Sequence, residues 1–317
     1  MSFLLLALSI VIIVFSSNAL VDGASALAKK LNISDLIIGL TIVAFGTSSP
    51  ELTVNLFASI QGKTDLAIGN VVGSNIFNFL VILGIAAIVY PVSVKSNSVW
   101  IEIPLTLLAA LVLAVCANDI LLEGQAISQL SRTDGLVLLC FFLVFLYYSV
   151  YVAIKNPETG GESIKLMPTW KSILFVVLGL GGLFLGGQLL VDNAVTIAKS
   201  WGMTESVIGL TIVAAGTSVP ELATSVAAAY KKNSDIALGN VVGSNIFNTF
   251  FILGVSSTIT PIPFEPRANF DLVINIVCSL IVFTSVMIGR GHKISRLEGG
   301  LFVVGYIVYV SYLLASL

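Results

Sequence analysis

Long apolar runs, separated by short polar or Gly/Pro-rich points, extend along the whole chain. A helix that spans a membrane needs about 20 mostly apolar residues, and ten segments meet this requirement. We expect them at residues 3–28, 36–60, 66–91, 98–118, 134–154, 170–198, 206–230, 236–261, 269–288 and 297–316. The longest polar interval is Lys155–Pro168. The pattern therefore predicts an all-α membrane protein of ten transmembrane helices without an inserted soluble domain.

The chain repeats its own sequence at an offset of 170 residues. Residues 38–52 match residues 208–222 at 13 of 15 positions, and residues 67–78 match residues 237–248 at 11 of 12. Each copy contains five predicted helices, so the second copy must enter the membrane in the opposite orientation, as in many secondary transporters. We predict two inverted five-helix repeats, at 1–154 and 169–317, joined by a linker at 155–168.

Basic residues are unevenly divided between alternate loops, eleven on one side of the predicted helices and four on the other. The eleven are Lys29, Lys30, Lys95, Lys155, Lys165, Lys171, Lys231, Lys232, Arg290, Lys293 and Arg296, and the four are Lys63, Arg132, Lys199 and Arg267. Cytoplasmic loops are enriched in Lys and Arg. We therefore expect the linker in the cytoplasm and both termini outside.

The composition supports a chain embedded in a lipid bilayer. Hydrophobic residues make up 57% of the chain and charged residues 10%, and the mean hydropathy is +1.04, whereas about a quarter of the residues of soluble domains are charged. With 15 basic and 17 acidic residues, nucleic acid is not an expected partner. The three cysteines and the single histidine, His292, do not form the spaced clusters of a zinc site. We expect no cofactor and find no indication of a protein partner.

Acidic residues fall at the centres of the second and seventh predicted helices, within GTSSPE at residues 46–51 and GTSVPE at residues 216–221. A carboxylate at the bilayer centre costs at least about 2.5 kcal/mol, so Glu51 and Glu221 should face the bundle interior and serve a function. Each is preceded by a proline, which lacks an N–H and breaks the helix. The freed backbone carbonyls can then become ligands.

The hydroxyl residues of these motifs are spaced to approach their own glutamate. Thr47 and Ser48 lie four and three residues before Glu51, so their oxygens converge if the intervening turn is near-helical. Bonding of the hydroxyls back to the preceding turn is the alternative interpretation.

A second repeated motif, GNVVGSNIFN, occupies residues 69–78 and 239–248 near the start of the third and eighth predicted helices. Asn78 and Asn248 fall at the depth of the two glutamates. For these asparagines, a plain interhelical hydrogen bond is the alternative interpretation.

Both motifs together offer carboxylate, hydroxyl, amide and carbonyl oxygens. These are the ligands that Ca²⁺ prefers, and thiolate and imidazole are absent from the set. Two carboxylates also neutralise one Ca²⁺.

The paired motifs strongly resemble the two α-repeats of the cation/Ca²⁺ antiporter superfamily, and especially the prokaryotic Na⁺/Ca²⁺ exchangers. This resemblance implies a secondary active antiporter of the prokaryotic inner membrane that exchanges Ca²⁺ for Na⁺ by alternating access. Its first and sixth helices would form a sliding gating pair. With the motif analysis, it gives the expected ion ligands: Glu51, Glu221, Thr47, Thr217, Ser48, Ser218, Asn78, Asn248, Ser74 and Ser244, and the carbonyls of Ala44 and Ala214.

One departure leaves the coupling ion open. Some members of the superfamily carry an aspartate at the position of Asn248, and the missing acid bears on stoichiometry and on proton or K⁺ coupling. A Ca²⁺/H⁺ or K⁺-coupled exchanger is therefore the main alternative. A cation channel is a weaker one, because channels usually build one pore from several subunits. An intramembrane enzyme with an acid–base pair of carboxylates is the weakest, because no nucleophile or cofactor motif accompanies the glutamates.

The loop asymmetry predicts the side on which the linker lies. In a background without Cys116, Cys140 and Cys278, the Gly160→Cys variant should react with an impermeant maleimide only from the cytoplasmic side. Intact cells and inside-out vesicles provide the two sides. Labelling of intact cells would reverse the predicted topology.

Overall fold

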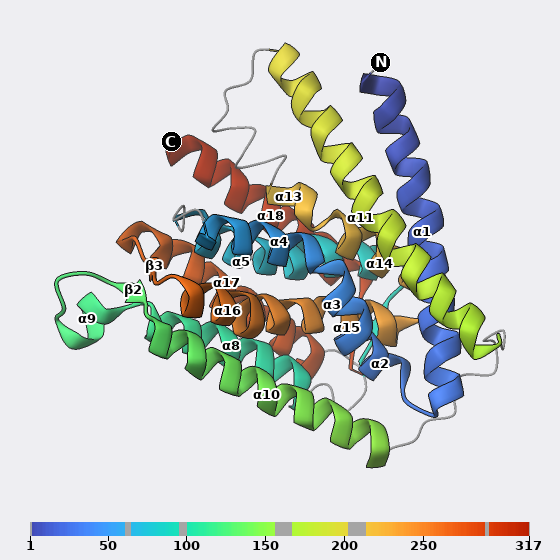
Figure 1. Ribbon diagram of the computed structural model, residues 1–317, viewed down its shortest axis with the longest axis horizontal. Helices are drawn as coiled ribbons and strands as arrows, with labels where there is room; N and C mark the ends of the chain where they lie inside the picture. The colour runs from blue at the N-terminus through green and yellow to red at the C-terminus, as the bar shows by residue number, and fades with distance from the viewer. Residues whose placement is uncertain are drawn as a thin grey trace.

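The computed structural model describes residues 2–60, 65–94, 100–155, 167–201, 214–288 and 292–316, which are mainly helical (Figure 1). The α-helices are α1 (Ser2–Leu31), α2 (Asp35–Ile38), α3 (Ala44–Thr47), α4 (Ser49–Ile60), α5 (Asp65–Phe77), α6 (Leu83–Val89), α8 (Glu102–Cys116), α9 (Asp119–Glu123), α10 (Arg132–Lys155), α11 (Thr169–Ser200), α13 (Ala214–Thr217), α14 (Val219–Tyr230), α15 (Ser234–Ile246), α16 (Leu253–Ile259), α17 (Asn269–Ile288) and α18 (Arg296–Ser316). In the described part of the chain, the π-helical segments η1 (Gly39–Val43), η2 (Asn78–Ile82) and η4 (Phe247–Ile252) join neighbouring α-helices, and a 3₁₀ turn, η5 (Pro266–Ala268), precedes α17.

Within these described ranges, seven helices are long and apolar enough to cross a membrane, or eight if Asp35–Thr47 and Ser49–Ile60 count as one bent span. Their ends agree with the predicted segments to within a few residues. The helix in the predicted 98–118 segment, α8, has 15 residues. Residues 206–213 of the seventh predicted helix and most of the 155–168 linker lie outside the described residues. An all-helical membrane protein is thus confirmed, while the arrangement of ten spans stays a prediction.

The two spans that carry GNVVGSNIFN form the centre of the bundle. We compare the share of residues that is buried inside the protein in the most apolar 18-residue stretch of each span. This share is 83% for the span Ala67–Val89 and 94% for the span Ser234–Ile259. The corresponding share is 28% for α1 and 11% for α18, so these helices expose apolar side chains to lipid. A helix surrounded by other helices can be apolar on all sides, which fits the continuous apolar pattern around the motif.

Short antiparallel strand pairs connect loops from the two halves of the chain. Strand β1 (Val92–Ser93) pairs with β4 (Lys293–Ile294), with Val92 opposite Ile294. Strand β2 (Gln129–Leu130) pairs with β3 (Ile262–Pro263), with Leu130 opposite Ile262. These strand pairs provide hydrogen-bond partners for backbone N–H and C=O groups where the chain leaves the helices.

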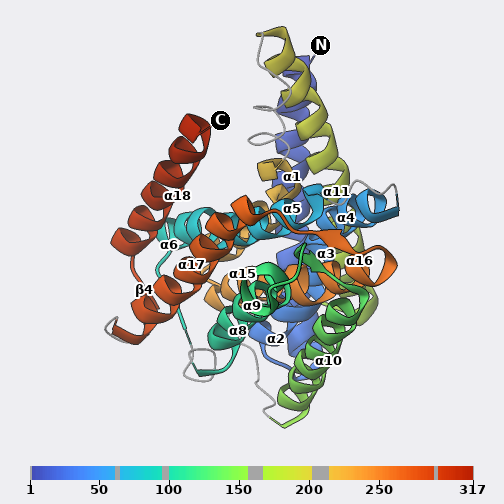
Figure 2. The same cartoon turned by 90° about the vertical axis from the view of Figure 1, so that its left-hand side faces the viewer.

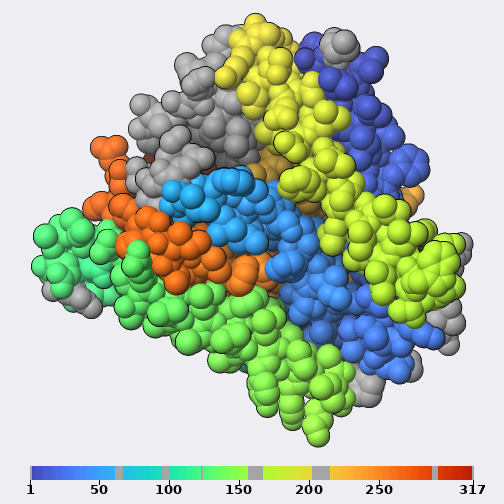
Figure 3. All heavy atoms as spheres, viewed as in Figure 1, coloured from blue at the N-terminus to red at the C-terminus, as the bar shows by residue number. Residues whose placement is uncertain are grey.

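Helices α1 and α11 run side by side, partly separate from the remaining helices (Figures 1 and 2). Their backbones approach closely at glycines, as is common between membrane helices. A Cβ at Gly23 would lie 2.8 Å from the Ser172 carbonyl oxygen, and a Cβ at Gly179 would lie 2.8 Å from the Leu20 backbone nitrogen. On the face shown in Figure 3, α11 passes beside α4 and across the end of the bundle. The pair therefore packs tightly within itself and borders the broken helix α3–α4.

The close contact between α1 and α11 predicts different effects for two neighbouring glycine substitutions. Gly179→Ala should lower the melting temperature of the purified protein, because overpacking costs about 1–3 kcal/mol and the obstructing atoms include backbone. Gly181→Ala is the matched control, since no described atom lies within 4 Å of its added Cβ. It should be neutral or slightly stabilising, because alanine is the better helix former. Equal melting temperatures for the two variants would contradict the packing.

Candidate ion-binding site

Two helices break immediately before the two glutamates. Helix α3 ends at Thr47, Ser48 adopts a turn conformation (φ −80°, ψ 8°), and α4 begins at Ser49. The two parts are bent by 47°. Ser218 has nearly the same conformation (φ −88°, ψ 8°) between α13 and α14. The prolines of GTSSPE and GTSVPE follow two residues later, where they cannot donate the helical hydrogen bond.

Each glutamate accepts a hydrogen bond from the serine of the other broken helix. Ser218 Oγ donates to Glu51 Oε1 at 2.9 Å, and Ser48 Oγ donates to Glu221 Oε1 at 2.8 Å. All four side chains are fully buried. The Ser48 hydroxyl thus donates to the glutamate of the other motif, because the two breaks lie against each other. The two halves of the chain therefore share one polar centre.

The two central helices contribute the next polar groups. Ser74 Oγ lies 2.8 Å from Ser218 Oγ and also donates to Glu51 Oε1 at 3.4 Å. Asn248 Nδ2 donates to Ser74 Oγ at 3.3 Å and to Asn75 Oδ1 at 3.2 Å. On the other central helix, Asn78 Nδ2 donates to Asn245 Oδ1 at 2.8 Å. These amide groups thus cross-link α5–η2 and α15–η4 beside the glutamates.

Several oxygens of this centre are buried without a hydrogen-bond partner in the part of the chain that the structure describes. They are Glu51 Oε2, Glu221 Oε2, Asn78 Oδ1, Asn248 Oδ1 and Ser244 Oγ. An unpaired buried polar group costs about 1–3 kcal/mol, and more when it is charged. The asparagines direct their Nδ2 groups into protein hydrogen bonds, which leaves their carbonyl oxygens available. A hard cation is the kind of species that carboxylate and amide oxygens coordinate.

A scan against family models matches residues 1–151 and 171–315 to the family described as sodium/calcium exchanger protein. The chain belongs to this family. The sodium/calcium exchanger MaX1 of Methanosarcina acetivorans is 32% identical over 342 residues, which cover 98% of this chain and 97% of that protein. The inner membrane protein YrbG of Escherichia coli is 37% identical over 319 residues, covering 98% and 95%.

A solved structure of the sodium-calcium exchanger NCX_Mj, soaked with zero Na⁺ and Ca²⁺, has a similar fold with a TM-score of 0.85 and 32% identity. The match covers 98% of each chain. The resemblance to the cation/Ca²⁺ antiporter superfamily is therefore confirmed by the family model, by relatives and by structure.

The other ligands expected from the exchanger family have different surroundings. Thr47 Oγ1 donates to Asn240 Oδ1 at 3.0 Å and to the Ala44 carbonyl at 3.3 Å. That carbonyl also accepts the Ser48 N–H at 3.0 Å, so its oxygen already has protein partners. Thr217 is partly exposed, and Ala214 is the first residue of α13. Thr47 and Ala44 thus lie beside the glutamate pair, and the Thr47 hydroxyl is held by Asn240 and the Ala44 carbonyl.

Several buried polar residues near the glutamates were not predicted from the sequence. Asn55 and Ser225 lie four residues after the two glutamates and are fully buried. A polar residue one helical turn after each glutamate, on the same face of the helix, could have identified them from the sequence. Asn75 and Asn245 were inside a quoted motif but had no assigned role. The π-helical segments η2 and η4, which begin at and just before the two candidate asparagines, were also missed, although such segments often occur at functional sites.

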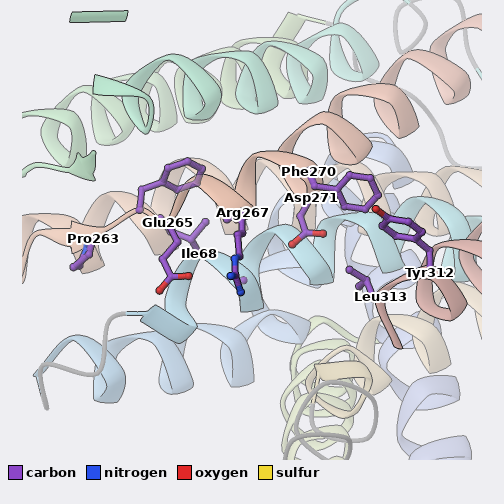
Figure 4. A pocket seen from close by; sticks show the side chains of 11 residues that line it. Ile68, Pro263, Glu265, Arg267, Phe270, Asp271, Tyr312 and Leu313 are labelled. Carbon is purple, nitrogen blue, oxygen red and sulfur yellow. The ribbon is translucent and has the colours of Figure 1, made fainter. Parts of the chain in front are cut away.

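Among the described residues, no group of three or more His, Cys, Asp and Glu side chains could hold a metal ion. The candidate site instead consists of two carboxylates surrounded by neutral hydroxyl and amide oxygens. A cavity of about 620 Å³ lies elsewhere, between the start of α5 at Ile68 and Gly69 and the segment before α17. Figure 4 shows Glu265 and Arg267 of this segment and Asp271 of the first turn of α17 projecting to the same side. None of the expected ion ligands lines this cavity.

Proposed function

We propose that this protein is a secondary active antiporter that exchanges Ca²⁺ for Na⁺ by alternating access. The observation that carries the proposal is the pair of fully buried glutamates, each with one unpartnered carboxylate oxygen, at the meeting point of two broken helices. The alternating parts are two inverted five-helix repeats, residues 1–154 and 169–317. The host is a prokaryotic inner membrane, and both termini face outward.

The proposed Ca²⁺ site centres on the two carboxylates. Two negative charges in a low-dielectric interior repel each other, and one Ca²⁺ between them removes that repulsion and neutralises the site. Amide oxygens of Asn78 and Asn248 complete a set of hard ligands, which suits the six to eight oxygens that Ca²⁺ takes in flexible geometry. The hydroxyl groups of Ser74 and Ser244 border this set.

The proposed Na⁺ sites use the same glutamates and the surrounding neutral oxygens. Their hydroxyl and carbonyl ligands are Thr47, Ser48, Thr217, Ser218, Ala44 and Ala214. Na⁺ and Ca²⁺ then compete for the two carboxylates, so both cannot occupy the site together. Competition for shared ligands makes the transport an exchange.

Orientation follows from the asymmetry of the basic loops. If the N-terminus is outside, α1 ends in the cytoplasm at Lys29 and Lys30, and α2–η1 forms the cytoplasmic half of the first broken helix. The start of α15 lies on that same side. The start of α5 and helix α13 then belong to the outer half. Access to the glutamates alternates between these two halves.

Removing either charge should abolish Ca²⁺ transport while leaving the protein folded. Glu51→Gln and Glu221→Gln each keep the size of the side chain but remove one of the two charges that balance Ca²⁺. We expect at least about a hundredfold loss of Ca²⁺ flux in proteoliposomes, since a lost buried charge partner costs several kcal/mol. Glu265→Gln changes an exposed glutamate outside the site and is the control. Flux near the wild-type rate in either site variant would exclude that glutamate as a ligand.

The coupling ion is tested by imposing Na⁺, K⁺ and pH gradients one at a time on Ca²⁺-loaded proteoliposomes. An inward Na⁺ gradient alone should drive Ca²⁺ efflux. Efflux that follows the pH gradient and ignores Na⁺ would assign the protein to the proton-coupled alternative. Dependence on a K⁺ gradient would assign it to the K⁺-coupled alternative.

Exchange should also be electrogenic. Three Na⁺ at a site with two carboxylates leave about one excess positive charge, whereas Ca²⁺ leaves none. Moving one charge through 100 mV is worth about 2.3 kcal/mol, so an interior-negative potential should accelerate Na⁺ influx and Ca²⁺ efflux. The voltage can be set with a K⁺ gradient and valinomycin. Na⁺-driven flux that does not change with voltage would exclude a net charge movement.

A further inference from the structure

Four asparagines of the repeated GNVVGSNIFN motifs form one buried network between the central helices. Asn78 and Asn248 are candidate Ca²⁺ ligands, whereas Asn75 and Asn245 have no role in the proposed site. All four side chains are at most 3% exposed. Each candidate ligand donates to the second asparagine of the other repeat, Asn78 Nδ2 to Asn245 Oδ1 at 2.8 Å and Asn248 Nδ2 to Asn75 Oδ1 at 3.2 Å. The two repeats therefore hold each other's candidate ligands.

The bond to Asn78 is fixed in direction by a backbone group. Asn245 Nδ2 donates to the Asn75 backbone carbonyl at 3.4 Å. A carbonyl oxygen only accepts, so it holds the Nδ2 end of the Asn245 amide and leaves the Oδ1 end facing Asn78. That oxygen also only accepts, so Asn78 must turn its own Nδ2 toward it. The Asn78 Oδ1 atom is left buried without a hydrogen-bond partner among the described residues.

The bond to Asn248 is supported by a hydroxyl group instead. Asn75 Nδ2 donates to Thr249 Oγ1 at 2.9 Å, and Asn248 Nδ2 also donates to Ser74 Oγ at 3.3 Å. Asn248 Oδ1 is likewise buried without a partner in the described part of the chain. A hydroxyl both donates and accepts, so the Asn75 amide can turn over and still bond to Thr249. The Asn245 amide cannot turn over against a backbone carbonyl.

We propose that Asn245 and Asn75 are positioning residues that present the carbonyl oxygens of Asn78 and Asn248, rather than their NH₂ groups, to the transported cation. An asparagine amide turned by half a rotation would direct N–H groups at Ca²⁺, so it is a ligand in only one of its two orientations. Partners that orient metal ligands are typically worth about 10–100-fold in metal affinity. This inference rests on the proposed Ca²⁺ site and adds the residues that orient its neutral ligands.

Removing the orienting acceptor should weaken Ca²⁺ binding, measured by isothermal titration of the purified full chain in Na⁺-free buffer. Asn245→Leu has a similar size but no acceptor, and it should raise the Kd for Ca²⁺ about tenfold or more. Asn245→Asp keeps an oxygen for Asn78 Nδ2 and should bind Ca²⁺ at least as tightly as the wild type. Asn75→Leu should give a smaller rise in Kd, because Ser74 still accepts from Asn248.

An aspartate at the ligand position gives a readout that a merely structural role would not change, because a carboxylate presents an oxygen in either orientation. The carboxylate in Asn78→Asp would face Asn245 Oδ1, which cannot turn away. Asn245→Leu should therefore be neutral or tighten Ca²⁺ binding in the Asn78→Asp background, opposite to its effect in the wild type. In Asn248→Asp, the Asn75 amide can turn over and donate to the carboxylate. Asn75→Leu should then raise the Kd less than in the wild type.

A second asparagine pair outside the site provides the control. Asn118 and Asn269 exchange two hydrogen bonds of 2.8 Å between the end of α8 and the start of α17. Asn118→Ala should lower the melting temperature without changing the Kd for Ca²⁺. An unchanged Kd in Asn245→Leu, or an equal rise in the wild-type and Asn78→Asp backgrounds, would overturn the proposal. If Asn245→Leu does not fold, the pair of Asn75→Leu and Asn248→Asp decides by the same comparison.

Na⁺-driven Ca²⁺ flux in proteoliposomes separates this proposal from the proposed function. The predicted changes in Kd in a chain that does not exchange Na⁺ for Ca²⁺ would support the positioning residues and refute the transport function. Exchange by the wild type, together with unchanged Ca²⁺ affinity in Asn245→Leu and Asn75→Leu, would refute only the positioning residues. A wild-type chain that binds no Ca²⁺ would refute both.

Discussion

Two carboxylates buried in the centre of a membrane protein place strong demands on the structure around them. Glu51 and Glu221 are fully buried and are supported by serines from opposite halves of the chain. Burying a charge is costly unless it is paired or hydrogen-bonded, and the present hydrogen bonds reach only one oxygen of each carboxylate. The breaks in both helices, the crossed serines and the amides of η2 and η4 all serve this centre. In the proposed function, a cation at the remaining oxygens completes this arrangement.

The same demands explain why the packing around the centre is close and built from small residues. Polar groups inside the bilayer must be satisfied within the protein, so the helices that carry them lie at the core, and the apolar helices face lipid. Helix α15 meets η1 through glycines on one side of the site. A site between the two repeated halves of the chain can be sealed from one side at a time, which is the physical requirement for the proposed alternating access.

The sequence was most informative where a feature is local or repeated. The 170-residue offset, the two prolines and the two glutamates predicted the breaks and the candidate acids, because helix breaking at proline and the cost of a buried charge depend on residue type alone. The pairing of Ser48 with Glu221 was not predictable in this way, because it depends on how two breaks meet in space.

The central claim is that Ca²⁺ and Na⁺ compete for the two glutamates of one site. Isothermal titration of the purified full chain with Ca²⁺, repeated over a series of Na⁺ concentrations at constant ionic strength, tests this claim most directly. The account predicts one high-affinity Ca²⁺ per chain, with an apparent Kd that rises more steeply than in proportion to the Na⁺ concentration. A Kd that does not change with Na⁺ would contradict it.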